Sequence, residues 1–206
     1  MDFARANLKA NIYDQAVLEG VATTFPQTED IIENGQVHGV SATDVQKILN
    51  LKHAWEFILD KDVIQSESNY HMLCHIAKLV NEGFFYDGGR ISGIPVQIGG
   101  TSYVPPLPIE TVVVERIDEI RSKDKEPIEI AIELCMYCMK TQVFKDGNKR
   151  ASVIFANHYL IAQGMGFLVI PEKDVPEFKK LLVQYYEGEP LEVIGAFLKE
   201  RCWKKF

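Results

Sequence analysis

Apolar residues recur along most of the chain at the three- and four-residue spacing of an α-helix, and short polar, glycine-rich or proline-rich breaks separate these stretches. This periodicity indicates helices that each bury one face. Pro26 is expected to interrupt the pattern near the N-terminus, and Ser41 or Thr43 is expected to cap the helix that follows. The predicted helices cover residues 3–20, 27–33, 44–59, 70–81, 109–121, 127–142, 148–163, 174–187 and 190–201.

Residues 128–141 are apolar over most of the helical surface, which indicates a central, buried helix. Between 89 and 106 the pattern changes to two short alternating runs around a Gly-Gly pair, and a Pro-Pro pair stops the second run. This pattern predicts a β-hairpin. Its free edge could receive an extended peptide, or the hairpin could be an arm that caps the core. The sequence therefore predicts an all-α fold with one small β-hairpin, in a single domain over residues 1–206.

Composition and charge narrow the class of protein. The chain has 206 residues, of which 47% are hydrophobic and 25% charged, enough for one well-filled core. Its net charge of −7 argues against broad binding to nucleic acid or acidic lipid, which needs a basic surface. We find no secretory segment and no apolar stretch near the ~20 residues of a membrane span. Four scattered cysteines form no disulfide framework, so a cytoplasmic location is expected.

The most informative stretch joins two apolar segments that are both predicted to be helical. It reads Phe-Lys-Asp-Gly-Asn-Lys-Arg over residues 144–150. Asp146-Gly147 is a strong turn signal, and Asn148 is a good residue to start a helix. A glycine turn, a helix N-terminus and two cations together make an anion site, most naturally for phosphate. Asp146 could hold a magnesium ion that also touches the phosphate.

This turn between two buried helices resembles the signature of the Fic (Fido) family. The segment 89–106 resembles that family's target-binding flap, and Leu18-Glu19-Gly20 resembles an inhibitory helix that some members carry at the N-terminus. The resemblance spans roughly residues 10–200 in matching order. It implies a Fic-like helical bundle, with N-terminal helices in 1–65 and a core in 66–201 that holds the motif at 142–150.

The family typically transfers AMP from ATP to a hydroxyl of a target protein, and the resemblance implies roles for individual residues. Asp146 would bind Mg²⁺, while Glu19, followed by Gly20, would enter the phosphate site and compete with the γ-phosphate. The implied nucleotide-binding residues are Phe144, Asp146, Gly147, Asn148, Lys149 and Arg150. The implied flap residues, which would contact the target, are Val96, Gln97, Ile98, Gly99, Gly100, Thr101 and Tyr103.

Three positions depart from the family's pattern. The catalytic His, two positions before the motif's Phe, is replaced here by Gln142. Glutamine has no proton equilibrium near neutral pH, and loss of a general base typically lowers a rate by ~10²–10⁴-fold. Val153 stands where many members have a second Arg, and Gln15 stands where the inhibitory motif has Ser or Thr.

These departures leave several hypotheses. The first is a nucleotide-binding Fic-like protein whose AMP transfer is impaired or altered by Gln142. The second is a catalytically inactive nucleotide-binding regulator or a toxin–antitoxin-type module. Removal of AMP from a protein, with Glu19 positioning water, is a weaker alternative. A DNA-reading helix within 41–59 is disfavoured by the acidic total charge. The expected ligands are ATP and Mg²⁺ and the expected partner is a protein, while enzymatic status and homo-oligomer formation stay open.

Overall fold

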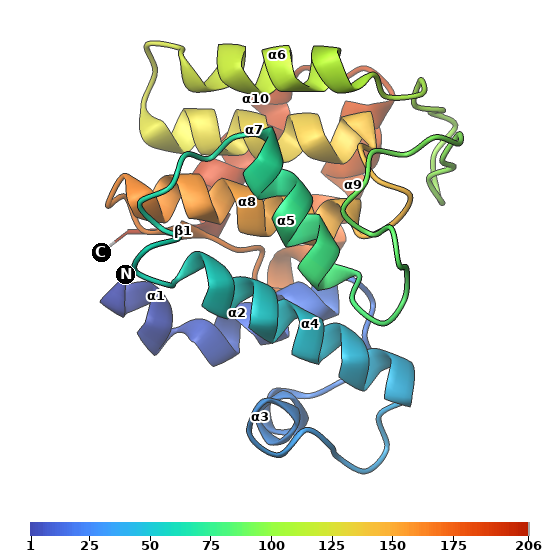
Figure 1. Ribbon diagram of the computed structural model, residues 1–206, viewed down its shortest axis with the longest axis vertical. Helices are drawn as coiled ribbons and strands as arrows, with labels where there is room; N and C mark the ends of the chain where they lie inside the picture. Colours follow the sequence, from blue (N-terminus) through green and yellow to red (C-terminus); the bar gives the residue numbers. More distant parts are fainter. Residues whose placement is uncertain (206) are drawn as a thin grey trace.

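A central pair of helices organises the fold of the computed structural model, which describes residues 1–205 (Figure 1). Helices α7 and α8 lie side by side in the middle, with α6 on one side of the pair and α4 on the other. Helix α5 crosses the front of this stack, and α9 and α10 lie behind it. The helices are α1 Asp2–Ala6, α2 Leu8–Leu18, α3 Phe25–Asn34, α4 Ala42–Ile58, α5 Tyr70–Val80, α6 Glu110–Arg121, α7 Pro127–Thr141, α8 Asn148–Ala162, α9 Val175–Tyr186 and α10 Leu191–Phe197.

The core lies on both sides of α7 and α8. One cluster packs Trp55 and Phe155 among residues of α2, α4, α5 and α8. The other packs Met136 and Phe178 among residues of α7, α8, α9 and α10. Helix α7 is buried along almost its whole length, as its apolar sequence predicts. The all-α fold class is confirmed, and the helices of the first 65 residues share a core with α8.

The N-terminal helices differ slightly from prediction. The segment 3–20 forms two helices that meet at Asn7. Pro26 lies inside the first turn of α3 and does not precede that helix, because proline's missing N–H and fixed φ suit this position. Thr24 caps α3 in a capping box, with its N–H bonded to the Gln27 Oε1 at 2.9 Å. Ser41, one of the two predicted caps, accepts a hydrogen bond from the Asp44 N–H at 3.1 Å.

The predicted β-hairpin over 96–104 is wrong in its pairing. In the described part of the chain this segment forms no strand ladder, and Ile91 makes only an isolated antiparallel bridge with Phe144. An isolated two-stranded hairpin is marginal in water. Here a backbone N–H of the segment bonds to a side chain of another element and not to a partner strand. Glu187 Oε1 accepts hydrogen bonds from the Thr101 hydroxyl at 2.9 Å and the Ser102 N–H at 3.1 Å.

The two short strands lie elsewhere. Strand β1 (Phe167–Leu168) pairs antiparallel with β2 (Trp203–Lys204) near the C-terminus. Short helical turns, η1 Glu172–Asp174 and the π-helical η2 Leu198–Cys202, flank the last two helices. All four cysteines are free, and burial raises the pKa of the Cys135 thiol to about 12. None of the helices within residues 1–205 combines the length and apolar character needed to cross a membrane.

We expect the buried His158 to make the fold less stable in mild acid. Its Nε2 lies 2.9 Å from the Val63 carbonyl, which only accepts, so Nδ1 accepts the Ser68 hydroxyl at 2.7 Å. Burial lowers the pKa of His158 below its usual value. The unfolded chain therefore binds the proton more readily, and stability should fall as pH drops below about 6.5. Urea unfolding between pH 8 and pH 5 measures this loss.

His158→Gln should have a flatter pH dependence than the wild type, whereas the exposed control His71→Gln should keep the wild-type slope. Equal slopes for wild type and His158→Gln would contradict the assignment.

Candidate functional site

The turn between α7 and α8 contains two residues with left-handed backbone conformation. Gln142 has φ 51° and is the non-glycine residue with positive φ within 1–205. Gly147 has φ 75° and stands immediately before α8. A Cβ on Gly147 would come within 2.8 Å of Oδ1 of Asn81, the buried residue that follows α5, so both this close approach and the positive φ favour glycine. The turn therefore presents the N-terminus of α8 to an open cavity.

The side chain of Asn148 bridges this turn by hydrogen bonds to the backbone of Phe144. This asparagine is the first residue of α8, and Gly147 holds the cap position that the sequence assigned to Asn148. Its Oδ1 accepts the Phe144 N–H at 2.9 Å, and its Nδ2 donates to the Phe144 carbonyl at 2.7 Å. Phe144 itself is buried, and the Ser92 N–H bonds the neighbouring Val143 carbonyl at 2.8 Å. The side chain of Asn148 thus ties the start of the turn to its end.

Gln142 lines the cavity, but its amide is engaged within the protein. Its Nε2 donates to the Met139 carbonyl at 2.7 Å, and its Oε1 accepts from Asn148 Nδ2 at 3.0 Å. The residue is 9% exposed. In this conformation both ends of the amide face protein partners and not the cavity.

A buried cation lies beneath the first turn of α8. The Arg150 side chain is 4% exposed and donates to the Val80 carbonyl at 2.9 Å and to Asp146 Oδ2 at 3.1 Å. Its Nε lies 3.6 Å from Glu19 Oε2, and Lys149 Nζ lies 3.7 Å from Glu19 Oε1. Neither distance is short enough for a hydrogen bond. Among residues 1–205, Arg150 Nε and Glu19 Oε1 find no hydrogen-bond partner.

Glu19 reaches this point because α2 ends there. Gly20 has φ 77°, its N–H bonds the Val17 carbonyl at 2.9 Å, and the Val21 N–H bonds the Ala16 carbonyl at 3.0 Å. This pair of bonds is a Schellman motif, which stops the helix. Gly20 therefore lies outside the cavity and fixes Glu19 as the residue at the end of α2.

The cavity in front of α8 has a volume of about 540 Å³, within the range of small-molecule sites. It gathers most of the predicted site residues, although Arg150 and Phe144 lie beneath it and Gly20, Thr101 and Tyr103 lie outside its lining. Tyr103 stacks on Tyr186 with ring centroids 5.9 Å apart. The lining consists of Glu19, Val96, Gln97, Ile98, Gly99, Gly100, Gln142, Lys145, Asp146, Gly147, Asn148, Lys149, Lys179, Leu182, Val183 and Tyr186.

Sequence reasoning missed the wall that α9 contributes. Lys179, Leu182, Val183 and Tyr186 follow the spacing of one helical face, so a shared face could have been inferred. Periodicity alone does not tell a cavity wall from a core face.

Asp146 is the exposed carboxylate of the site. Its side chain is 54% exposed, and Oδ2 pairs with Arg150. No group of three or more His, Cys, Asp or Glu suited to a metal occurs among the described residues. Magnesium commonly takes one or two carboxylates and completes its shell with phosphate oxygens and water. The residues therefore fit a magnesium ion that enters with a phosphorylated ligand and do not form a metal cage of their own.

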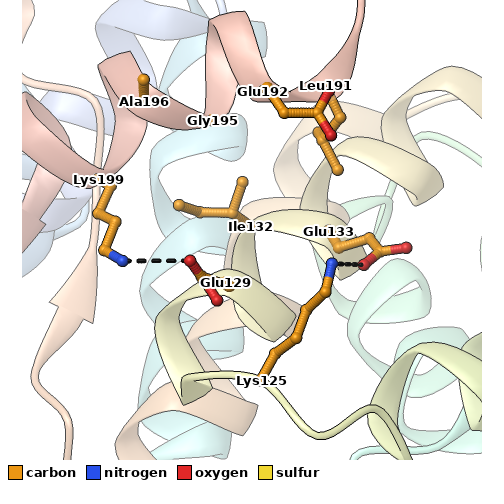
Figure 2. Close-up of a pocket in the computed structure, with 9 residues that line it drawn as sticks. All are labelled: Lys125, Glu129, Ile132, Glu133, Leu191, Glu192, Gly195, Ala196 and Lys199. Carbon is orange, nitrogen blue, oxygen red and sulfur yellow. Dashed lines mark hydrogen bonds and ion pairs between the residues drawn. The ribbon is translucent and has the colours of Figure 1, made fainter.

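A second, smaller cleft of about 290 Å³ lies between α7 and α10 (Figure 2). Two ion pairs lie beside an apolar floor that includes Ile132. Lys199 Nζ lies 3.3 Å from Glu129 Oε1, and Lys125 Nζ lies 3.6 Å from Glu133 Oε2. Leu191, the first residue of α10, belongs to its lining, but this helix follows Pro190 and not a glycine turn like the one at Gly147. The features expected of a phosphate site meet in the larger cavity.

Comparison with known proteins agrees with this geometry. Residues 67–160 match the family model described as the Fic/DOC family. The chain is 24% identical over 195 residues to the protein adenylyltransferase Fic of Drosophila grimshawi, and 25% identical to that of Drosophila willistoni. Each alignment covers 87% of this chain but only 38% and 37% of the relative. The chain thus spans less than two fifths of the length of these curated relatives.

Solved structures share the fold. A Fic domain containing signaling protein from Bacteroides thetaiotaomicron has a TM-score of 0.76 at 19% identity, covering 96% of this chain and 82% of its own. Fic-1 from C. elegans has a TM-score of 0.77 at 19% identity, covering 97% of this chain and 62% of its own. Residues 67–160 therefore match the Fic/DOC family model, and the chain has the fold of these solved Fic proteins.

Proposed function

We propose that the chain binds ATP with Mg²⁺ in the cavity before α8 and that it is a Fic-type AMP-transfer protein whose chemistry Gln142 impairs or alters. The curated relatives are named protein adenylyltransferases, which supports this class of reaction. The flap segment 96–100 lines the same cavity, so a protein target could reach the bound nucleotide there.

One observation carries the proposal: the carboxylate of Glu19 lies between Lys149 and Arg150 at the N-terminus of α8. An internal anion already occupies the cationic position, without the short hydrogen bonds that a phosphate could make. The free backbone N–H groups of the first turn add a partial positive charge. Withdrawal of Glu19 would leave these donors to a phosphate group.

The remaining residues have distinct tasks in this proposal. Asp146 would hold the magnesium ion, which neutralises phosphate charge when bound. The first turn of α8 would orient the phosphates. Transfer requires that the target's hydroxyl oxygen bond to the α-phosphorus, that the bond between the α-phosphorus and its bridging oxygen break, and that pyrophosphate leave. The hydroxyl proton must go to another acceptor such as water, because a glutamine amide does not take it.

A second candidate is a nucleotide-binding regulator without turnover. The hydrogen bonds of Gln142 favour it, because both amide ends are directed into the protein. In this case nucleotide occupancy would displace Glu19 and the end of α2, and a partner would respond to that displacement.

Glu19→Gly should tighten the binding of MgATP, since it removes the carboxylate that competes for Lys149 and Arg150. An increase of between about five- and 150-fold is typical of coupled binding equilibria. Isothermal titration calorimetry on the full chain measures it. Glu189→Gly, in the exposed turn after α9, is the matched control and should leave affinity unchanged. Equal affinity in the wild type and Glu19→Gly would refute competition by Glu19.

Gln142→His, made together with Glu19→Gly, should raise AMP transfer by ~10²–10⁴-fold, because it restores a general base. Histidine also tolerates the left-handed backbone at this position better than most residues. The assay follows label from the α-phosphate of ATP into lysate proteins and checks self-labelling by intact mass. Label with Glu19→Gly alone would show that Gln142 supports turnover.

Gln65→His, at an exposed position, controls for the added imidazole. If the doubly substituted chain binds MgATP but transfers no label, AMP transfer is the wrong reaction.

Asp146→Asn should abolish most of the difference in ATP affinity between magnesium and EDTA, because the amide is a poor substitute for the charged ligand. The comparison is made with Glu19→Gly present, so that binding is strong enough to measure. Asp118→Asn, an exposed substitution on α6, should retain the full magnesium effect. A magnesium effect that survives Asp146→Asn would remove Asp146 as the ligand.

A further inference from the structure

A single buried amide joins three helices beneath the candidate site. Gln15, on α2, is 1% exposed. Its Nε2 donates to the Arg150 carbonyl on α8 at 2.9 Å. Its Oε1 accepts from the indole N–H of Trp55 on α4 at 2.8 Å. Trp55 is fully buried, so none of these groups can exchange its partner for bulk water.

The chemistry of the partners fixes which way this amide points. An indole N–H only donates and a carbonyl only accepts, so the Gln15 oxygen must face Trp55 and its nitrogen must face Arg150. Replacement by an apolar side chain would leave a buried donor and a buried acceptor without their bonds. Gln15 is therefore a fixed anchor that holds α2 against both α4 and α8.

This anchor lies one helical turn before Glu19. Residues four apart share one face of a helix, so both side chains are directed at the first turn of α8. Gln15 bonds the main chain of Arg150, while Glu19 faces the guanidinium of the same residue. The Glu19 N–H also donates to the Gln15 carbonyl at 3.2 Å. The position of the Glu19 backbone is thus tied directly to Gln15.

The contacts of Glu19 do not fix its position by themselves. Its ion pairs with Lys149 and Arg150 are 3.7 and 3.6 Å long, and Oε1 has no hydrogen-bond partner within the described chain. Coulombic attraction at these distances is weakly directional, in contrast to the short bonds of Gln15. The position of Glu19 in the cavity is therefore set by Gln15, four residues earlier.

We propose that Gln15 is a positioning residue that holds Glu19 in the phosphate site through Trp55 and the Arg150 carbonyl. This inference rests on the proposed function, in which Glu19 competes with a phosphate. It makes the strength of that competition depend on the packing of α2 against α4. Weakening the joint between α2 and α4 would then favour nucleotide binding without a change in any residue that lines the cavity.

A double-mutant cycle with MgATP as the probe tests this role. The full chain is titrated by calorimetry as wild type, Gln15→Leu, Glu19→Gly and the double variant. We expect Gln15→Leu to tighten binding by a factor between about five and that of Glu19→Gly, and to add nothing when Glu19→Gly is present. A purely structural role would change affinity by the same factor in both backgrounds, which would overturn the proposal.

Two further variants guard the test. Trp55→Phe keeps an aromatic ring but removes the N–H that orients Gln15, so it should shift affinity in the same direction by a smaller factor. Trp55→Phe replaces Gln15→Leu in the double-mutant cycle if thermal unfolding shows that Gln15→Leu does not fold. Gln36→Leu, at an exposed position, should behave as wild type.

The outcomes separate this proposal from the function beneath it. Unchanged affinity in Gln15→Leu and Trp55→Phe, with tighter binding in Glu19→Gly, would overturn the anchor alone. Unchanged affinity in Glu19→Gly, or no MgATP binding by any variant, would overturn the proposed function and the anchor together.

Discussion

The buried guanidinium of Arg150 is the constraint on which the rest of the structure depends. A charge removed from water must be surrounded by partners, or the fold loses several kcal/mol (about 3–5 in measured cases). Here the partners come from three separate parts of the chain: the Val80 carbonyl at the end of α5, Asp146 in the turn before α8, and Glu19 at the end of α2. Bringing them to one cation draws α2, α5 and the turn together around the first turn of α8. The packing that surrounds the Arg150 side chain with protein partners therefore also forms the floor of the cavity.

The proposed competition between Glu19 and a phosphate depends on the same buried cation. The cationic end of α8 is only loosely satisfied by Glu19, because the ion pairs of 3.6 and 3.7 Å are longer than hydrogen bonds. Any anion that offers several acceptor oxygens could make shorter contacts with the same groups. The exchange of one anion for another needs no change in the deeper partner of the guanidinium, the Val80 carbonyl. Whether Glu19 or a phosphate occupies the cationic end of α8 would then depend on their relative affinities for it. A ligand shifts a conformational equilibrium by such a difference in affinity.

Much of this arrangement could be predicted from the sequence, and the failures have physical causes. Helical periodicity found the helices because each buries one face, and the buried character of α7 followed from its apolar surface. The motif at 144–150 predicted the turn before α8, because Asp-Gly favours a turn and Asn148 favours a helix start, while anion binding at this turn stays a prediction. The prediction of a hairpin was wrong because local alternation cannot show that the Ser102 N–H bonds to Glu187, which is far away in sequence. The α9 wall was missed for the related reason that one helical face looks the same whether it meets core or cavity. Gln15, predicted only as a departure from a family pattern, is an anchor because of partners on two other helices.

Gln142 shows why binding and chemistry should be considered separately in this chain. A non-glycine residue in the left-handed region is disfavoured by roughly 1–2 kcal/mol, so something must hold it there. Its two amide hydrogen bonds, to the Met139 carbonyl and from Asn148, supply that hold and link the last turn of α7 to the first residue of α8. The bonds between Asn148 and Phe144 do not involve the side chain at position 142, and the hydrogen bonds of Arg150 do not involve it either. The shape of the turn before α8 therefore depends on Asn148 and Arg150, whereas position 142 is where the family resemblance implies the general base. Under the proposed function, the ligand site can stay intact while turnover is lost or changed, so ligand binding and turnover are two separate properties of this chain.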